Sequence, residues 1–310
     1  MPNPNLRFRL GNLETLNSQT IKFYLGLDAG ATRCRARLRS ADGSMRAEAE
    51  GGAGNIYRDY AQGVAGIRGA IAAALHEGGE PACANVALGL GIAGQQPGME
   101  SARLSHEFAE FAAVAVANDA TIACLGAHAG ADGGVIIAGT GSAGILRRGG
   151  RQTIIGGQGF LLGDDGSAAR LGADALRGAL RAHDGLAPRT PLAARLMARY
   201  GDDANTVTQW ALTASPSDYG AFAEPVLEAA AKGDQLGRAC VQSAVAAIAA
   251  LAQALSALGA ERIALVGGFG EPLRAFLDVA LAAQLRRPLW DATDGAVLLA
   301  GGRLPQRVQP

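Results

Sequence analysis

The sequence contains few charged and few aromatic residues. Charged residues make up 18% of the 310 residues, aromatic residues make up 5%, and the formal net charge is zero. A protein that binds the phosphate backbone of nucleic acid needs a clustered basic face, and the sequence has no run of Lys or Arg. The composition therefore argues against a nucleic-acid partner. The abundance of Ala and Gly favours tight helix packing over large aromatic platforms.

Several familiar signatures are missing as well. The absence of a G-x-x-x-x-G-K-[ST] loop excludes a P-loop enzyme, and no G-x-S-x-G or Cys/His nucleophile arrangement stands out. The histidines are scattered without ligand spacing, which disfavours a metal centre built on them. The cysteines form no C-x-x-C pair, so we expect reduced thiols in a cytoplasmic protein; they are Cys34, Cys83, Cys124 and Cys240.

The sequence also offers little to a membrane. Residues 1–19 lack the apolar core of a signal peptide, so we expect residues 1–21 to form a loose extension. The most apolar helix is expected at about 240–258, and Gln and Ser residues interrupt it. We therefore expect a buried core helix rather than a membrane span, and no membrane partner.

Two matching glycine-rich turns are the most informative feature of the chain. In each, an apolar strand runs into a turn of small residues and out into a second strand, first over 24–38 and again over 135–146. Backbone N–H groups in such a turn are free to point at one ligand, and phosphate is their natural ligand. Two such turns in matching contexts indicate a duplicated architecture that closes on one polyphosphate from both sides.

The order of expected elements around these turns predicts the fold. Three strands followed by alternating helices and strands occur twice, which predicts two α/β domains with mixed sheets flanking an inter-domain cleft. We expect the domains at 22–128 and 129–310, the second with a helical insertion, and leave open whether the C-terminal helix packs back on the first. The expected strands are 22–28, 33–40, 45–50, 86–92, 113–117, a meander within 134–156, and 262–266. The expected helices are 59–77, 99–111, one opening at 118–119, a helical region over 166–258, and 271–285 and 294–303.

A carboxylate lies beside the first turn. Asp28 ends the first strand, directly before Gly30 and its neighbours. A carboxylate next to a phosphate nest would repel phosphate unless a cation intervened, and Mg²⁺, which usually keeps several waters, resolves that conflict. We therefore expect Asp28 on the magnesium side of a nucleotide site; the alternative is an ordinary Asp-Ala-Gly hairpin turn.

A second carboxylate follows the short strand that ends at 117. Asp119 and the preceding Asn118 open a helix there, and most such pairs act only as a helix N-cap. Phosphoryl transfer to an alcohol, however, needs a carboxylate placed to take the hydroxyl proton. Strand ends are where α/β domains collect ligands, so Asp119 is the best-placed candidate for that base.

Two further clusters are framed by glycines. Residues 156–167 read GGQGFLLGDDGS, and the paired carboxylates could cap a helix or hydrogen-bond several hydroxyls of a sugar. Residues 267–270 read GGFG between an apolar strand and a helix, where a flat ring could lie against the backbone. This second cluster lacks the third-glycine spacing of a dinucleotide fingerprint.

In this order and spacing, the five segments resemble the actin, heat-shock ATPase and sugar-kinase superfamily. The chain is similar to the bacterial glucosamine and N-acetylglucosamine kinases, which share their BadF/BadG-type fold with the activating ATPases of benzoyl-CoA reductase. The stretches that carry the likeness are VANDATIACLGAH, IAGTGSAGIL and GFLLGDDGSAARLG, and HDGLAPRTPL at 183–192 resembles the glucosamine-specific branch. The resemblance covers about 22–303 and implies two actin-like, ribonuclease H-like domains.

The resemblance also implies roles for individual residues. Asp119 matches the base that deprotonates the sugar 6-hydroxyl, and Asp28 matches the magnesium side. The residues expected to bind ATP are Asp28, Gly30, Thr32, Arg33, Thr140, Gly141, Ser142, Gly267 and Gly268. The residues expected to bind the sugar are Asn55, Ala93, Gly94, Asn118, Asp119, Gln158 and Asp164. A homodimer is the family expectation.

The chain departs from the family pattern at a few positions. Ala29 and Ala31 flank Gly30 where the family often has a run of glycines, so the turn cannot rely on glycine freedom there. Gln158 stands where many N-acetylglucosamine kinases carry tryptophan, and Ala143 where some carry asparagine. Both differences weaken the case for a pocket shaped around an acetyl group, and they slightly favour the free amino sugar.

Three functions remain open at this stage. The first is an ATP-dependent hexosamine 6-kinase that uses ATP and Mg²⁺ and closes its two domains to exclude water. The second is an ATPase that activates a partner redox enzyme, although such activators bridge an iron–sulfur cluster between subunits and no suitable cysteine pair appears in the helical region. The third is a sugar-sensing binding protein, which the short extension before residue 22 and the missing basic face disfavour.

Overall fold

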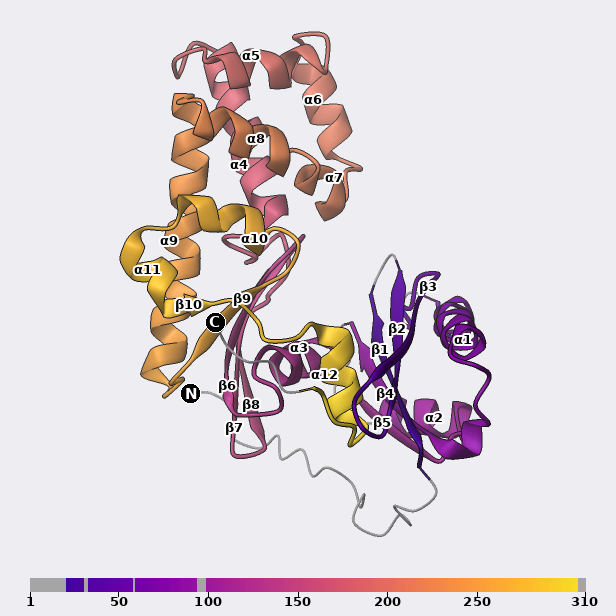
Figure 1. Cartoon of the computed structure of the whole chain (residues 1–310). Coiled ribbons are helices and arrows are strands. Elements are labelled where there is room, and N and C mark those ends of the chain that lie inside the picture. The colour runs from indigo at the N-terminus through magenta and orange to yellow at the C-terminus, as the bar shows by residue number, and fades with distance from the viewer. Residues whose placement is uncertain (1–20, 31–32, 58, 94–98, 306–310) are drawn as a thin grey trace. The chain divides into compact units, whose positions relative to one another are not determined.

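The computed structural model describes residues 21–30, 33–57, 59–93 and 99–305 (Figure 1). The chain divides into two compact units, each with its own sheet. Unit 1 comprises Met1–Gly133, Arg147–Gln152 and Pro288–Pro310, and unit 2 comprises Gly134–Leu146 and Thr153–Arg287. Both sheets are flanked by helices, so the predicted α/β class with two mixed sheets is confirmed.

The first sheet has the strand order β3-β2-β1-β4-β5. Its strands are β1 (Phe23–Ala29), β2 (Cys34–Ser40), β3 (Met45–Gly51), β4 (Val86–Ile92) and β5 (Ala113–Asn118). The first three form an antiparallel meander, and β4 and β5 extend it in parallel with β1. All seven residues of β4 are buried, as expected for a central parallel strand.

Helices cover the two faces of this sheet. They are α1 (Tyr60–Glu77), η2 (Cys83–Asn85), α2 (Met99–Glu107), α3 (Asp119–Ala127) and α12 (Ala292–Leu299). Helix α1 contacts β2 and β3, while α12 contacts β1, β4 and α3. The contact between α12 and α3 is a close one, because a Cβ on Gly295 would overlap the carbonyl oxygen of Ile122. The last helix of the chain thus belongs to unit 1.

Buried ion pairs fix the N-terminal end of α12 to strand β2. Arg37 lies 2.8 Å from Asp291 and 2.7 Å from Asp294, and Arg39 lies 2.8 Å from Asp294. Although burial opposes ionisation, hydrogen bonds from the Asp294 amide and from Arg37 hold the pKa of Asp291 below its usual range. Asp291 also caps α12, so one carboxylate both starts the helix and attaches it to the sheet.

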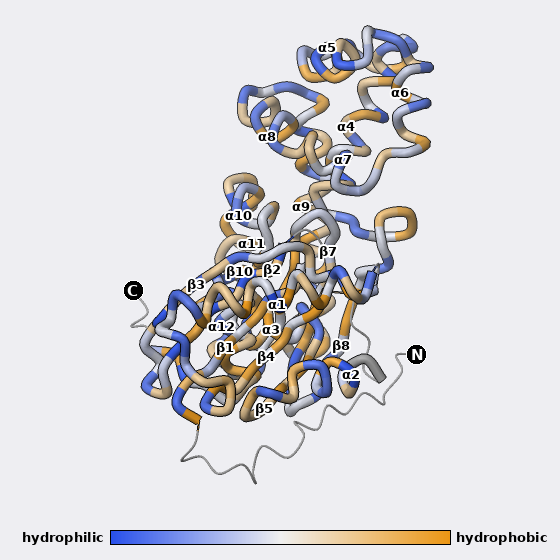
Figure 2. Tube along the Cα trace, turned by 90° about the vertical axis from the view of Figure 1, so that its right-hand side faces the viewer, coloured by the Kyte–Doolittle hydropathy of each residue, from blue (hydrophilic) through white to orange (hydrophobic). Residues whose placement is uncertain are grey.

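The second sheet has the order β10-β9-β6-β7-β8. Its strands are β6 (Gly133–Ala138), β7 (Ser142–Arg148), β8 (Arg151–Gly156), β9 (Ile263–Val266) and β10 (Leu285–Arg286). The helices that follow the chain order are α4 (Ala168–His183), α5 (Pro191–Ala198), α6 (Ala204–Ala211), α7 (Pro216–Gly220), α8 (Ala223–Ala231), α9 (Gln235–Ala257), α10 (Gly270–Leu273), η3 (Arg274–Phe276) and α11 (Val279–Gln284). Apolar residues lie on helices as well as on strands (Figure 2), and the buried clusters of both units draw on both kinds of element.

Some of the expected helices were placed wrongly. The single helix predicted at 271–285 is three short pieces, because Leu277 is extended and Asp278 accepts the Leu281 amide to cap a new helix. The helix predicted at 294–303 is α12, which its Asp291 cap starts earlier, and the helix predicted at 99–111 ends at Glu107. The strands lie within about a residue of their predicted bounds.

Helix α9 is long and apolar enough to cross a membrane by the criteria of length and composition. Only 33% of its most apolar window is buried in the structure. One face, with Ile248, Ala252 and Leu255, lies in the core of unit 2, and the helix packs on α4, α5 and α8. The prediction of a core helix therefore holds for one face of α9.

Candidate active site

The carboxyl ends of three parallel strands meet at one edge of the first sheet. In the register of the sheet, Ala29 pairs with Ile92, and Ile92 pairs with Asn118. The Ala93 amide donates a hydrogen bond to Ala29 O at 3.1 Å. Since the strand ends are adjacent, Asp28, Ala93, Asn118 and Asp119 lie along this edge, where α/β sheets bind ligands. Thr32 and Gly94, which were also predicted to bind ligands, lie outside the described residues.

Asp28 carries an arginine partner on the neighbouring strand. Arg35 stands directly opposite Asp28 in the β1–β2 pairing, and its Nη2 lies 3.0 Å from Asp28 Oδ2. The Asp28 side chain is 19% exposed, so its carboxylate is largely shielded from water but still reachable. A partly buried carboxylate needs a positive partner, and Arg35 supplies one within the protein.

The described part of the first turn is held together by backbone hydrogen bonds. The Gly30 amide donates to Arg33 O at 3.0 Å, and the Gly54 amide donates to Gly30 O at 3.0 Å. These bonds bring Asn55, which follows Gly54, beside the turn. The Arg33 side chain is 61% exposed and pairs with Glu50 at 3.1 Å.

Asp119 is the first residue of α3, directly after β5. The Asn118 side chain caps the helix by accepting the Thr121 amide, so the N-cap that the sequence suggested is present. Burial raises the pKa of the Asp119 carboxyl, the Ala120 amide that donates to Oδ1 at 2.8 Å opposes the rise, and the negative charge of Asp28 adds to it. A carboxylate with a raised pKa is a better proton acceptor than an exposed one.

The second turn, in unit 2, is closed by its own carboxylate. Asp164 Oδ1 accepts a hydrogen bond from the Ser142 amide at 3.3 Å, and the Ser142 hydroxyl donates to Asp165 O at 2.7 Å. A Cβ on Gly141 would lie 2.9 Å from the Asp164 carboxylate, so glycine lets that side chain approach the turn closely. Asp164 adopts a positive φ of 60°, which is uncommon for a residue other than glycine. This loop therefore holds Asp164 against the predicted phosphate turn.

The Gly-Gly turn after β9 lies beside the same phosphate turn. A Cβ on Gly267 would overlap Ala138 O, and the Phe269 amide donates to that oxygen at 3.0 Å. Ala138 immediately precedes Gly139 and Thr140 of the second turn, and a Cβ on Gly268 would meet no atom within 4 Å. Unit 2 thus places open space over Gly268 next to the turn that was predicted to hold phosphate.

Gln158, a predicted sugar ligand, lies in an exposed part of the loop. Its Nε2 donates to Gly156 O at 3.3 Å, within the same glycine-rich loop, and the side chain is exposed. The neighbouring Leu161 and Leu162 are 88% and 87% exposed. These leucine side chains of the loop are therefore exposed, while Gln158 lies beside Gly163, the residue before Asp164, since a Cβ on Gly163 would lie 3.2 Å from the Gln158 Cβ.

The carboxylate predicted to face magnesium is Asp28. Across the described ranges of the chain, no three His, Cys, Asp or Glu side chains lie close enough to hold a metal ion together. Mg²⁺ is commonly bound through one or two carboxylates, with water and substrate phosphate as the other ligands. The shielded carboxylate of Asp28 fits that mode.

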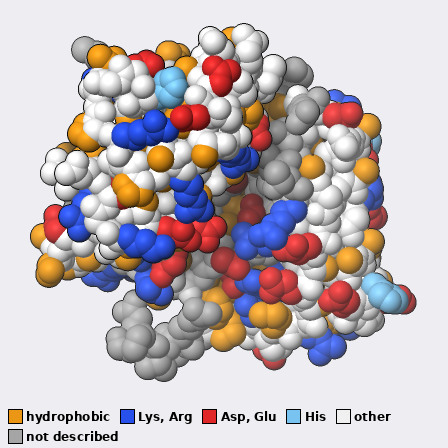
Figure 3. Space-filling model, turned by 90° about the horizontal axis from the view of Figure 1, so that it is seen from above, with side chains coloured by type: hydrophobic (Ala, Val, Ile, Leu, Met, Phe, Trp, Pro, Cys, Tyr) orange, Lys and Arg blue, Asp and Glu red, His pale blue; other side chains and the backbone are white. Residues whose placement is uncertain are grey.

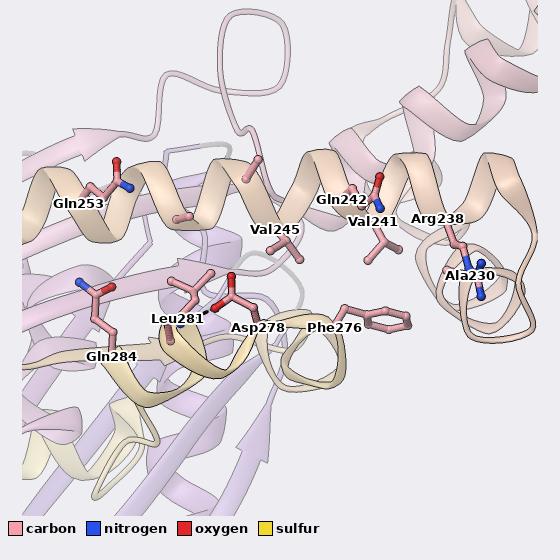
Figure 4. Close-up of a pocket in the computed structure, with 13 residues that line it drawn as sticks. Ala230, Arg238, Val241, Gln242, Val245, Gln253, Phe276, Asp278, Leu281 and Gln284 are labelled. Atoms are coloured by element: carbon pink, nitrogen blue, oxygen red, sulfur yellow. Dashed lines mark hydrogen bonds between the residues drawn. The ribbon is translucent and has the colours of Figure 1, made fainter.

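A separate groove lies away from these residues. It has a volume of about 700 Å³ and lies between α9 and the segment from Phe276 to Gln284 (Figure 4). Val241, Val245 and Leu281 supply apolar surface, and Arg238 and Asp278 supply charge. None of the predicted site residues lines it. On the face shown in Figure 3, acidic and basic side chains are interspersed rather than gathered into a basic patch.

The sequence did not predict three residues that contact the site at the edge of the first sheet. Arg35, Thr121 and Gln152 each contact a predicted site residue or its partner. The alternation Arg35, Arg37, Arg39 along β2 is a signal that could have placed Arg35 opposite Asp28, because alternate residues share a face. Nothing in the sequence points to Gln152.

Comparison with known proteins gives a consistent result. Residues 25–300 match the BadF/BadG/BcrA/BcrD ATPase family. The chain is 35% identical over 285 residues to the glucosamine kinase GspK of Vibrio cholerae, which covers 91% of this chain and 96% of that protein.

Solved structures agree with this assignment. A proposed N-acetylglucosamine kinase from Chromobacterium violaceum matches with a TM-score of 0.80 and 32% identity, over 91% of this chain and 99% of that one. A glucokinase of the ROK family from Streptomyces griseus, solved with glucose and AMPPNP, shares the fold with a TM-score of 0.52 and 18% identity, over 90% of this chain and 98% of that one. The chain is a member of the BadF/BadG/BcrA/BcrD ATPase family and has the actin-like fold of the sugar kinases.

Proposed function

We propose that the chain is an ATP-dependent amino-sugar kinase that phosphorylates the 6-hydroxyl of glucosamine or N-acetylglucosamine, with glucosamine slightly favoured. The observation that carries the proposal is the edge of the first sheet, where Asp119, with a raised pKa, stands beside Asn118 and near Asp28. The likeness to a glucosamine kinase over nearly the whole chain supports the substrate class.

In the reaction, Asp119 accepts the proton of the attacking sugar hydroxyl. That oxygen forms a bond to the γ-phosphorus of ATP, the bond from phosphorus to the β,γ-bridging oxygen breaks, and ADP leaves with that oxygen. Asp28 would hold Mg²⁺ through water, and the ion, when bound, offsets the negative charge on the phosphates. Asn118, Asn55 and the 93–94 turn would orient the sugar, and Asp164 and Gln158 are further candidates for its hydroxyls.

The remaining nucleotide contacts are assigned to the two turns. Gly30, Thr32 and Arg33 would bind phosphate in unit 1, and Thr140, Gly141 and Ser142 would do so in unit 2. Gly267 and Gly268 would lie under the nucleoside, because the space over Gly268 is open. A homodimer and a cytoplasmic location remain expectations, the second based on the unpaired cysteines.

The partner-activating ATPase is the weaker alternative. An activator of that kind needs cysteine ligands for an iron–sulfur cluster, and here Cys34, Cys124 and Cys240 are buried. Burial raises the pKa of the Cys34 and Cys124 thiols to about 12 and that of Cys240 to about 11. Such thiols are poor metal ligands, since the thiolate is the ligand form.

A coupled assay of ADP release tests the proposal. Glucosamine, N-acetylglucosamine, glucose and mannosamine are supplied at matched concentrations, with ATP and Mg²⁺. We expect turnover with the first two and the higher kcat/KM with glucosamine. A clear preference for glucose would overturn the substrate assignment, and ATP consumption that no sugar stimulates would overturn the kinase itself.

A further inference from the structure

The Thr121 hydroxyl lies between two side-chain amides. Its Oγ1 is 2.6 Å from Asn118 Oδ1 and 2.7 Å from Gln152 Oε1. A hydroxyl carries one proton and can donate to only one of two oxygens. Gln152 Nε2, at the other end of its amide, is buried without a hydrogen-bond partner among the described residues. The three side chains therefore cannot all be satisfied with the Gln152 oxygen toward Thr121.

One arrangement resolves both problems. If the Gln152 amide is turned over, Nε2 donates to Thr121 Oγ1 and the Thr121 hydroxyl donates to Asn118 Oδ1. The two ends of a glutamine amide have nearly the same shape, so the turn costs no packing. It leaves a carbonyl oxygen rather than an N–H group unpaired in the interior, and buried oxygens tolerate this better than buried N–H groups.

The direction of these hydrogen bonds fixes the orientation of Asn118. Oδ1 then accepts two bonds, from the Thr121 hydroxyl and from the Thr121 amide at 2.8 Å. Nδ2 is left as a donor, and it makes no hydrogen bond to any residue of the described ranges. Asn118 therefore presents an N–H group beside Asp119, which presents oxygen. A donor next to an acceptor suits two neighbouring groups of a polyol.

We propose that Gln152 is a positioning residue that orients the Asn118 amide through Thr121, so that Asn118 donates a hydrogen bond to the amino sugar. This inference rests on the proposed function, because it assigns the sugar as the acceptor. Gln152 is the second residue of strand β8 and lies in the segment Arg147–Gln152, which belongs to unit 1 as Thr121 does. It touches neither Asp119 nor Asp28 through any described hydrogen bond.

The first test replaces Gln152 by methionine, which has a similar length and no donor. We expect Gln152→Met to raise the KM for glucosamine about tenfold, the effect of one lost hydrogen bond, with the KM for ATP within about twofold of wild type. Thr121→Val should do the same, and Thr121→Ser, which keeps the hydroxyl, should recover most of the affinity.

Thr206→Val is the matched control. Thr206 also donates its hydroxyl to the N-cap residue three positions earlier, Asp203, at 2.7 Å. Thr206→Val removes the same kind of bond at the start of α6, so it should lower the melting temperature without changing the KM for glucosamine. A glucosamine KM that is unchanged in Gln152→Met, or equally raised in Thr206→Val, would overturn the inference.

A double-mutant cycle separates this inference from the proposed function. The melting temperatures of Gln152→Met, Thr121→Val and the double variant should show a combined loss smaller than the sum of the single losses, because both changes break one connected set of bonds. Additive losses of melting temperature would overturn the proposed hydrogen-bonded link from Gln152 through Thr121. If the wild-type protein phosphorylated no amino sugar, the proposed function would be refuted. A non-additive cycle would still support the link between Gln152 and Thr121.

Discussion

The two glycine-rich turns look alike in sequence and differ in what surrounds them. In the first, a Cβ on Gly30 would lie 2.9 Å from a backbone atom, the carbonyl oxygen of Arg33. In the second, a Cβ on Gly141 would lie 2.9 Å from the side-chain carboxylate of Asp164. Neither Gly30 nor Gly141 has a positive φ. At Gly30 and Gly141, glycine permits close approach rather than a special backbone conformation, and Ala29, the last residue of β1, has no positive φ either.

Their charges differ as well. The first turn stands beside Asp28 and near Asp119, whose pKa is raised by burial and raised further by the negative charge of Asp28. In the second turn the Ser142 amide and hydroxyl are already engaged by Asp164 and Asp165, and Thr140 supplies the other hydroxyl of the turn. Under the proposed function, the first turn would serve cation and proton chemistry and the second would serve neutral hydrogen bonding. Four experiments test this division.

Replacing the two carboxylates by amides should give the largest contrast. We expect Asp119→Asn to lower kcat by about 10²–10⁴-fold, because a general base is lost. Asp164→Asn keeps an oxygen that can accept the Ser142 amide, and we expect a loss of about tenfold or less. Steady-state kinetics of both variants decide the matter. Equal losses would contradict the division, and near-normal turnover of Asp119→Asn would remove Asp119 as the base.

The pH dependence of Asp119 should be visible in both rate and stability. Its raised pKa moves the acidic limb of kcat above the range of an ordinary aspartate, and Asp119→Asn should abolish that limb. As the pH rises, the Asp119 carboxyl ionises in the unfolded protein before it ionises in the folded protein. The stability that its neutral form contributes is therefore fully present below the pKa of the unfolded state, and it is lost as the pH rises through the higher pKa of the folded state.

Asp119→Asn should therefore melt at a higher temperature than wild type near pH 7, and the difference should vanish at pH values below the ordinary aspartate pKa. Asp164→Asn serves as the control at each pH. A stability difference that does not change with pH would argue against the raised pKa.

Glycine-to-alanine substitutions compare how easily the atoms packed against each turn can move. Gly30→Ala meets a backbone oxygen that cannot move alone, whereas Gly141→Ala meets a side chain that can. We expect Gly30→Ala to cost about 1–3 kcal/mol of unfolding free energy and Gly141→Ala less than that. Denaturant unfolding measures both. The reverse order would show that the Asp164 carboxylate is held more rigidly than the first hairpin.

Removing Arg35 should have the smallest effect on the fold. The pair with Asp28 is partly exposed, so Arg35→Gln should change stability by about 1 kcal/mol or less. Loss of a positive charge beside Asp28 should lower the Mg²⁺ concentration that gives half-maximal activity, by about two- to fivefold. Arg46→Gln, at an exposed position of β3 with no assigned role, is a control for net charge. An unchanged Mg²⁺ requirement would place the ion away from Asp28.

Much of the first site could be predicted because it follows from strand order. Asp28, Ala93 and Asn118 each end a parallel strand, and parallel strand ends meet at one edge. The link between Asp164 and the second turn, 22 residues away, could not be predicted, because it depends on the positive φ of Asp164 and on loop geometry. The break at Leu277 and Asp278 was missed because local helix periodicity continues through it.

Strand β2 and helix α12 form their ion pairs across more than 250 residues of chain. Gly26 and Gly89, in the middle of the sheet, are covered by the backbone of α12. Because α12 follows unit 2 in the chain, the ribosome must synthesise all of unit 2 before α12 can cover that face of the first sheet. Until then, Arg37 and Arg39 lack their partners Asp291 and Asp294. Most of unit 1 is synthesised before unit 2, yet unit 1 cannot be completed until α12 is made. We therefore expect unit 2 to fold before unit 1 is complete, whereas N-terminal units usually fold first during synthesis.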